Sequence, residues 1–348
     1  MKRLILAIIF SLLFVIPVDA TQIEAPAVPE SAADIMPENT DAFGDALLEL
    51  LVKSIRKVRP DLQEAARVSA VVIFTAMLFS LLPIISEKLN HATEIAAVTM
   101  ISTVIFQHTD AMVNLATNTV MEVLDYGKLL CQVMTAALAA QGGITTSSAL
   151  YVGTTAFITL LGALISRFLV PLIYVFLAFG LASSAMGNEF LKTVSNSIKT
   201  LLTWLLKTVI GIFTAYLSIT GVVSGTTDQA ALKASKVAIS SFVPVVGGIL
   251  SDSSESVLIS MGIIKNTAGI YGILAVLAVF VSPFLRIGAH YLILKASSAL
   301  CAAFCSKQIT SITDNYATAM GFLVGIMAVG CILVLISTIC YLKGTGNG

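Results

Sequence analysis

Charged residues are scarce in this sequence: aspartate, glutamate, lysine and arginine together make up 11% of the 348 residues, and the formal net charge is zero. No long run of lysine and arginine occurs, so the chain lacks the electrostatic footprint of a nucleic-acid-binding protein. Hydrophobic residues make up 57% of the chain, and the mean hydropathy is +0.95. These values exceed those of soluble globular domains and indicate an all-α membrane protein that crosses the bilayer several times.

Motifs typical of hydrolases and nucleotide-using enzymes are also absent, since the chain contains no G-x-S-x-G, Walker A or H-E-x-x-H pattern. Cys301 and Cys305 share a helix face, but two thiols without a third ligand make a poor zinc site, and packing is the favoured interpretation. We therefore predict no catalytic residue, no metal and no cofactor, and we do not expect an enzyme. The remaining histidines and cysteines are widely spaced: His91, His108, His290, Cys131, Cys331 and Cys340.

The first 20 residues have the pattern of a signal peptide. Lys2 and Arg3 precede an apolar run over residues 4–16, and small residues at Val18 and Ala20 flank a cleavage site after Ala20. An uncleaved anchor remains an alternative, although about 13 apolar residues are short for a membrane span. In either case the next segment is expected to begin outside the cytoplasm.

Two short regions follow the signal peptide. Residues 21–42 are rich in acidic residues and proline and contain no basic residue, which predicts an acidic flexible linker. In residues 43–60, apolar side chains recur at helical spacing and basic side chains occupy much of the remaining surface, which predicts an amphipathic helix at the membrane interface. A helix docked on another protein fits this second pattern equally well. The apolar positions are Leu47, Leu51, Ile55 and Val58.

A polytopic helical membrane domain is predicted over residues 61–343. Pro60 interrupts the preceding helix, and Asp61 and Glu64 have the spacing of a capping box that starts the next one. Stretches of roughly 20 apolar residues then predict about seven or eight transmembrane helices. The candidate stretches are residues 66–85, 94–113, 146–166, 168–187, 201–223, 268–285, 288–305 and 320–341.

A re-entrant or broken-helix hairpin is predicted within residues 224–256. Its apolar run, residues 237–250, is about 14 residues long and too short to cross the bilayer. Pro244 removes a backbone donor from this run, and Gly247 and Gly248 permit the chain to reverse. Irregular backbone at membrane depth has to be buried in protein or to line water, so the hairpin is a candidate path-lining element.

Polar residues on both sides of this run predict the helices that flank the hairpin. Lys233 and Lys236 lie on the polar face of a helix before it. Asp252 and Glu255 have capping spacing and start a helix after it. A surface loop joined to an interfacial helix is the alternative interpretation of the whole stretch.

Ionisable residues inside apolar stretches are the remaining polar features, because such groups usually face a partner or water at membrane depth. Lys207, Lys265, Arg286 and Lys295 are of this kind. Lys207 can also snorkel to the interface from near a helix end, and Arg286 with His290 can mark a helix start. Gly321 and Gly325 form a GxxxG pair that would let two helices approach closely.

The sequence resembles one known family in the region just before and through the predicted hairpin. The matching residues are "TAYLSITGVVSGTTD", residues 214–228, followed by "KASKVAISSFVPVVGGILSDSSESVL". They resemble the stage III sporulation protein AE family. The resemblance implies a multi-pass protein of the mother-cell membrane surrounding the forespore. It also implies assembly with other membrane subunits into a channel or secretion complex between the two cells, and it transfers no catalytic residue.

A stand-alone secondary transporter is the alternative function, with the hairpin at its substrate site. Transporters of that kind contain an inverted repeat of their broken helix. Residues 141–143, Gln-Gly-Gly, break a short apolar run and are a possible counterpart, but the two halves show no residue-level similarity. The transporter therefore ranks second. Membrane lipid is expected as an environment in both cases, and homo-oligomerisation stays open.

Overall fold

The computed structural model describes residues 26–37, 43–85, 90–140, 144–219 and 267–345, and this part of the chain contains helices and no strand. The elements in chain order are η1 (Glu30–Ala32), α2 (Phe43–Ile85), α3 (Asn90–Ala140), α4 (Ile144–Leu164), η3 (Ile165–Leu169), α5 (Val170–Met186), α6 (Glu189–Ile219), α9 (Thr267–Phe304) and α10 (Lys307–Thr345). The all-α class predicted from composition is confirmed.

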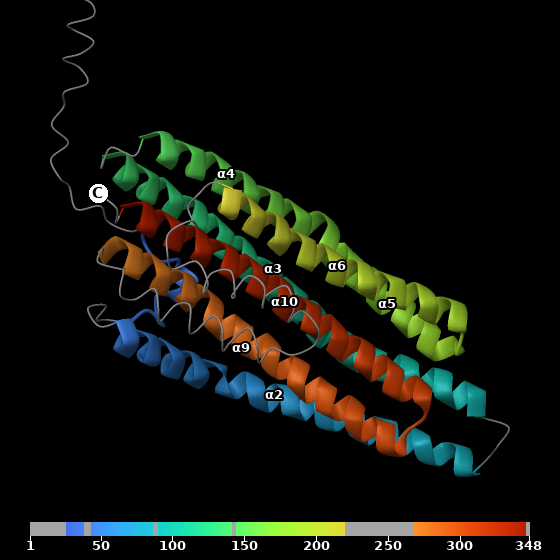
Figure 1. Cartoon of the computed structure of the whole chain (residues 1–348). Coiled ribbons are helices and arrows are strands. Elements are labelled where there is room, and N and C mark those ends of the chain that lie inside the picture. The colour runs from blue at the N-terminus through green and yellow to red at the C-terminus, as the bar shows by residue number, and fades with distance from the viewer. Residues whose placement is uncertain (1–25, 38–42, 86–89, 141–143, 220–266, 346–348) are drawn as a thin grey trace, which may run out of the picture.

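Helix α10 lies at the centre of the bundle. It packs most extensively against α3 and α9, and it also contacts α4, α5 and α6 (Figure 1). Helix α2 covers α9 on the side away from α4 and α6. The most apolar window of α10 is 78% buried, compared with 22% for α6, so α10 is the core helix and α6 presents most of its surface outward.

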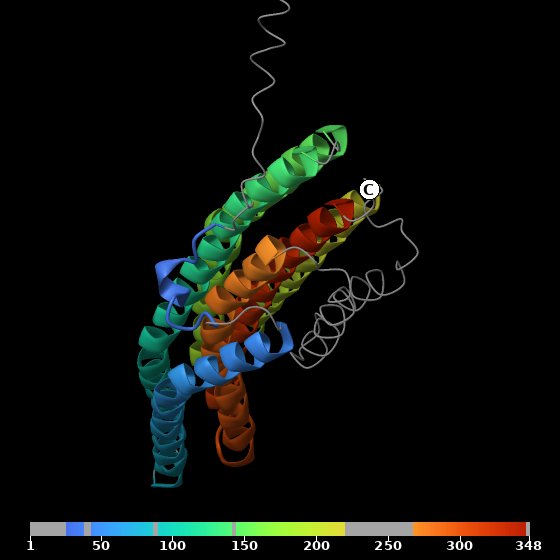
Figure 2. The ribbon, with the colours of Figure 1, turned by 90° about the vertical axis from the view of Figure 1, so that its left-hand side faces the viewer.

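Helix α2 is continuous through Pro60, so the break predicted at this proline is wrong. Proline lacks a backbone N–H and its ring crowds the preceding turn of the helix. Where the residues before and after it are both packed, the helix bends at the proline and continues. Figure 2 shows that α2 changes direction part-way along its length. The predicted interfacial helix, residues 43–60, is therefore the first part of a longer bent helix. Of the predicted apolar positions, Val58 is buried, Leu47 and Leu51 are half-buried and Ile55 is exposed. The other buried positions are Phe43, Ala46, Leu50 and Ser54.

The described part of the predicted flexible linker, residues 26–37, packs against the helices. Ala32 and Ile35 are buried in the common core. Two residues of α3 bind this segment. Glu122 Oε1 accepts from the Ser31 hydroxyl at 2.6 Å, and the Tyr126 hydroxyl donates to the Pro26 carbonyl at 3.2 Å. Lys57 of α2 pairs with Asp34 at 3.0 Å. The acidic composition predicted a solvated segment, but its few apolar residues and these polar contacts bind it to α2 and α3.

Five helical stretches of the described residues are long and apolar enough to cross a membrane, so the predicted count of seven or eight is not confirmed. Residues 268–285 and 288–305, predicted as two spans, form the single helix α9. Residues 146–166 and 168–187 form one continuous rod, because the π turn η3 joins α4 to α5 directly before Pro171. Residues 94–113 belong to the long helix α3, which is not among the five. The five stretches are Phe43–Leu81, Leu150–Met186, Glu189–Tyr216, Gly269–Phe304 and Lys307–Leu342.

Glycines let α3 and α10 approach closely at two positions. A Cβ added at Gly127 of α3 would lie 2.7 Å from Val334 Cγ2 of α10. Reciprocally, a Cβ at Gly330 of α10 would lie 2.9 Å from Val120 Cγ1 of α3. Each helix thus contributes a valine that fills the space above a glycine of the other. Small residues at such crossings are typical of membrane helix packing.

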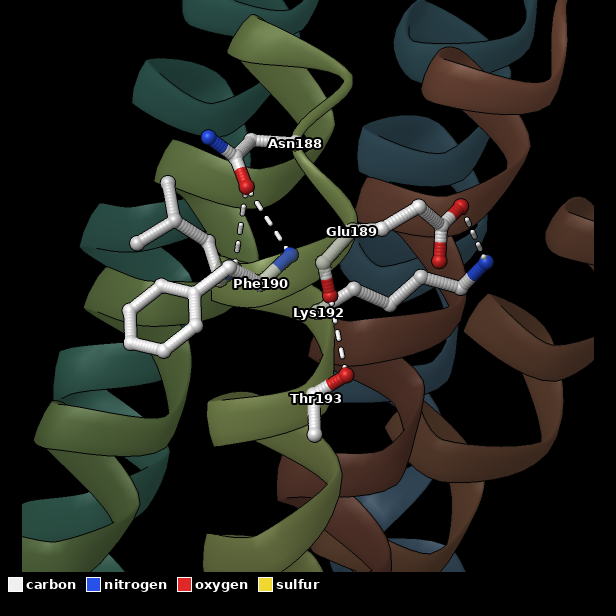
Figure 3. Close-up of polar contacts among 6 residues, drawn as sticks. Asn188, Glu189, Phe190, Lys192 and Thr193 are labelled. Carbon is white, nitrogen blue, oxygen red and sulfur yellow. Dashed lines mark hydrogen bonds and ion pairs between the residues drawn. The ribbon is translucent and has the colours of Figure 1, made fainter.

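A tight turn reverses the chain between α5 and α6. Gly187 takes the left-handed conformation, with φ +63°, and its N–H donates to the Ser183 carbonyl at 2.9 Å. Asn188 then caps α6, because its Oδ1 accepts from the Phe190 N–H at 2.8 Å and from the Leu191 N–H at 3.4 Å (Figure 3). Gly187 is the end predicted from the sequence for the span 168–187.

Asn188→Ala is expected to reduce the free energy of unfolding by about 1 kcal/mol, because the first turn of α6 loses its side-chain acceptor. Asn188→Asp should retain most of the stability, since a carboxylate accepts the same N–H groups and suits the positive end of the helix. Denaturant unfolding of the purified full-length chain in detergent measures both changes. Equal stability of the alanine and aspartate variants would show that the cap is dispensable.

A charge cluster between helices α2, α3 and α9

An ion pair joins α2 to α9 within the bundle. Arg286 Nη2 of α9 lies 3.3 Å from Asp61 Oδ1 of α2, and the two side chains are 34% and 24% exposed. Arg286 Nε is buried and makes no hydrogen bond within the described residues. Both residues lie in the interior of helices that are candidate membrane spans. The pair therefore brings together two largely buried charges that would each be costly without the other.

Three further ionisable residues gather around this pair. His108 Nδ1 of α3 lies 3.7 Å from Glu64 Oε1 of α2. His290, one turn after Arg286 on α9, is 5% exposed and interacts electrostatically with the other four groups. We refer to Asp61, Glu64, His108, Arg286 and His290 as the charge cluster. It connects three helices that are far apart in the sequence.

A hydroxyl pair extends the polar contact along the same two helices. Ser69 Oγ of α2 is hydrogen-bonded to Ser297 Oγ of α9, and both side chains are buried. Arg286, His290 and Ser297 recur at intervals of four and seven residues, which places them on one face of α9. That face is opposite Asp61 and Ser69, so the contact between α2 and α9 contains charged and polar residues over several helical turns. Hydrogen bonds of this kind link helices where lipid supplies no competing partner.

The chemistry available to the charge cluster is electrostatic. Arg286 and Asp61 form an ion pair, Glu64 lies beside His108, and His290 is buried next to them. Among the described residues, no group of three or more histidine, cysteine, aspartate or glutamate side chains is arranged to hold a metal ion. None of the five cysteines forms a disulfide within the described residues, and all but Cys305 are buried, in agreement with the packing role predicted for Cys301.

The charge cluster corrects two predictions from the sequence. Asp61 and Glu64 do not cap a helix, because they lie inside α2, where their carboxylates pair with Arg286 and His108. Arg286 and His290 do not mark a helix start, because α9 begins at Thr267 and continues through both. The predicted hairpin residues Lys233, Lys236, Pro244, Gly247, Gly248, Asp252 and Glu255 lie outside the described residues, as do Lys265 and the cleavage site after Ala20, and those interpretations stay predictions.

Two other polar contacts between helices were missed from the sequence. The Tyr174 hydroxyl of α5 donates to Asp110 Oδ1 of α3 at 2.6 Å. Lys295 Nζ of α9 lies 2.5 Å from Asp314 Oδ1 of α10. Lys295 was noted as a charge in an apolar stretch, but its partner lies near the start of the next helix. The general signal, an ionisable residue in an apolar run, was present for Asp110 and Lys295, whereas the identity of each partner was not.

A comparison with protein families decides where this chain belongs. Residues 30–344 match the family model described as "Stage III sporulation protein AE", a range that covers η1 and the helices described above except the last residue of α10. The chain belongs to the stage III sporulation protein AE family. The resemblance noted from residues 214–228 and the sequence that follows is therefore confirmed over nearly the whole chain.

A curated relative supports the assignment to the stage III sporulation protein AE family. The chain is 20% identical over 225 residues to the stage III sporulation protein AE of Bacillus subtilis (strain 168). This match covers 65% of the chain and 56% of the relative, so the aligned region spans little more than half of the relative's length. No solved structure matches the chain.

Proposed function

We propose that this protein is a membrane-embedded subunit of a channel or secretion complex between the mother cell and the forespore, and that it is required for sporulation. The family match over residues 30–344 carries the proposal. The five candidate membrane spans support it, because such a subunit has to be held in a bilayer. We place it in the mother-cell membrane around the forespore, where it acts without catalysis and with other membrane subunits of the same complex as partners.

A stand-alone secondary transporter is the second candidate, and the charge cluster is the observation that favours it. Ionisable residues inside a helical bundle mark ion or proton pathways in many transporters. In this chain, however, Arg286 and Asp61 are paired with each other, which also fits a purely structural contact. Family membership concerns sporulation, so the complex subunit ranks first.

Deletion of the gene in its spore-forming host is expected to abolish heat-resistant spores while vegetative growth continues. An ectopic wild-type copy should restore them. Affinity purification of a tagged copy from sporulating cells should recover other membrane proteins in stable proportion. Normal spore yield from the deletion strain would contradict the proposal, whereas a solitary purified chain that takes up solute in vesicles would favour the transporter.

A further inference from the structure

The first part of α2, up to the turn after Pro60, carries a strip of apolar side chains on its outward side. Four large aliphatic residues are exposed there at intervals of four, three and seven residues, which places them on one helix face. We call them the apolar strip. They are Leu48 at 62%, Val52 at 54%, Ile55 at 57% and Leu62 at 38%.

Three arginines lie beside the apolar strip. Arg56, Arg59 and Arg67 are exposed, and their spacing of three and eight residues keeps them on one side of the helix. The two lysines of the same part of α2 pair with Glu49 and with Asp34. Within the described part of the chain, by contrast, no acidic side chain lies at ion-pair distance from any of the three arginines. We call these arginines the arginine strip.

The distribution of charge divides α2 into two parts of different character. Residues 43–61 contain seven charged side chains, whereas residues 62–81 contain two, Glu64 and Arg67. The second stretch therefore supplies the apolar part of the candidate membrane span Phe43–Leu81. About 20 residues cross the hydrocarbon core, so about half of the 43 residues of α2 lie beyond it. The seven charged residues of the first stretch are Asp45, Glu49, Lys53, Arg56, Lys57, Arg59 and Asp61.

The bend in α2 keeps its charged first part close to the apolar second part. Figure 2 shows the first part, in blue, running across the direction of the second part, in blue-green. A straight helix would carry its charged half away from the end of the span. Because α2 turns instead, the exposed side of the first part stays near the level at which the apolar stretch begins.

We propose that the arginine strip and the apolar strip together bind anionic phospholipids of the surrounding membrane. Guanidinium groups donate paired hydrogen bonds to phosphate oxygens, and exposed aliphatic side chains suit the adjoining acyl chains. Basic residues next to a membrane span are attracted to anionic headgroups. Free phosphate would leave the apolar strip uncovered, so the lipid is the ligand that matches both strips. The inference does not rest on the proposed channel function.

The lipid site also accounts for the position of the charge cluster. Asp61 and Glu64 belong to the same junction of α2 as the two strips, on either side of Leu62. Headgroups bound there place the charge cluster at the level of phosphate and water rather than in hydrocarbon. Five ionisable side chains can gather at that level at a lower cost of desolvation.

Fluorescence quenching by brominated lipid tests the site in the full-length chain reconstituted into nanodiscs. Trp204 is the one tryptophan of the sequence, so Trp204→Phe with Val52→Trp moves the fluorophore onto the apolar strip. The nanodiscs consist of phosphatidylcholine with the same small fraction of either brominated phosphatidylglycerol or brominated phosphatidylcholine. Brominated phosphatidylglycerol is expected to quench about threefold more strongly, because the arginine strip concentrates the anionic lipid.

Charge variants in the same background identify the groups responsible. Arg56→Gln, Arg59→Gln and Arg67→Gln together should make the two lipids quench equally, and the chain should still fold because all three side chains are exposed. Lysine at the same three positions, as Arg56→Lys, Arg59→Lys and Arg67→Lys, should keep most of the preference, since the charge remains.

A matched control removes the same number of positive charges from other exposed positions. Lys192→Gln, Lys199→Gln and Lys307→Gln should leave the preference for phosphatidylglycerol unchanged, because these lysines lie on α6 and α10. An equal loss of preference in this control would show a general charge effect and no site on α2.

Two further results would overturn the inference. If neither brominated lipid quenches the introduced tryptophan, another protein, a second copy or a part of this chain outside the described residues covers the apolar strip. If both lipids quench equally before any arginine is replaced, lipid covers the strip without a bound anionic headgroup. Neither result bears on the proposed channel function, which the deletion strain tests separately.

Discussion

Arg286→Met is expected to lower the free energy of unfolding by about 3 kcal/mol, because it leaves the Asp61 carboxylate without its partner between α2 and α9. This is the lower end of the range for breaking a buried ion pair, since the two side chains are 34% and 24% exposed. Methionine keeps an apolar stem at this position, so the change reports mainly the charge. Denaturant unfolding of the full-length chain in detergent measures it, and spore yield should fall in parallel.

The double variant Arg286→Met with Asp61→Asn should recover most of the lost stability, because neither charge is then left unpaired. Lys128→Met is the matched control. It breaks a pair with Asp125 within α3, where the side chains are 31% and 63% exposed, and should change stability by less than about 0.5 kcal/mol. If Arg286→Met is as stable as the wild type, the ion pair does not hold α2 against α9.

Gly127→Val is expected to cost about 2–3 kcal/mol, because α3 and α10 have no room for a side chain at this crossing. The first added carbon would already lie 2.7 Å and 2.9 Å from the two γ-methyl groups of Val334. A valine in a helix has one strongly preferred rotamer, so rotation of Val334 does not relieve the contact. The two helices would have to separate along their contact. The same unfolding measurement in detergent reports the loss.

Gly288→Val in α9 is the control for glycine replacement in a helix. No atom lies within 4 Å of a Cβ added at Gly288. Its effect should stay within about 0.5 kcal/mol, because valine is slightly better than glycine in a helix interior. Gly127→Ala combined with Val334→Ala should cost less than the sum of the two single changes, since one makes the space that the other fills. Similar losses from Gly127→Val and Gly288→Val would contradict the close approach of α3 and α10.

The class of the fold could be predicted from composition, whereas the ends of the helices could not. An apolar content this high has to be helical or a closed barrel in a membrane, and runs of about 20 apolar residues indicate helices. The breaks predicted at Pro60 and between residues 285 and 288 are absent, since each lies inside a continuous helix. Local signals for a helix end were present at both places. Packing along α2 and α9, with the Arg286–Asp61 pair between them, outweighed those signals.

The charge cluster could be predicted only in part. Arg286 stood out because charge is rare in apolar runs. Its partner Asp61 precedes an apolar run and looked like a helix cap, since a capping box and an inward-facing ion pair use the same residue types. Which residue of α2 faces Arg286 depends on how α2 and α9 are aligned along each other. No local pattern in a single sequence reveals that alignment.

Helix α3 has a consequence for how the protein is made. It packs closely against α10 near the centre of the bundle, yet it is not among the five helices apolar enough to cross a membrane. Its polar residues are satisfied by groups from elsewhere in the chain, such as the Tyr174 hydroxyl at Asp110 and the Ser31 hydroxyl at Glu122. A nascent α3 leaves the ribosome long before α5 and α10 exist, so the insertion machinery meets a segment that lipid alone does not favour. Because α3 packs most extensively against α10, we expect its final position in the bundle to depend on the C-terminal helix, so that the order of assembly differs from the order of synthesis.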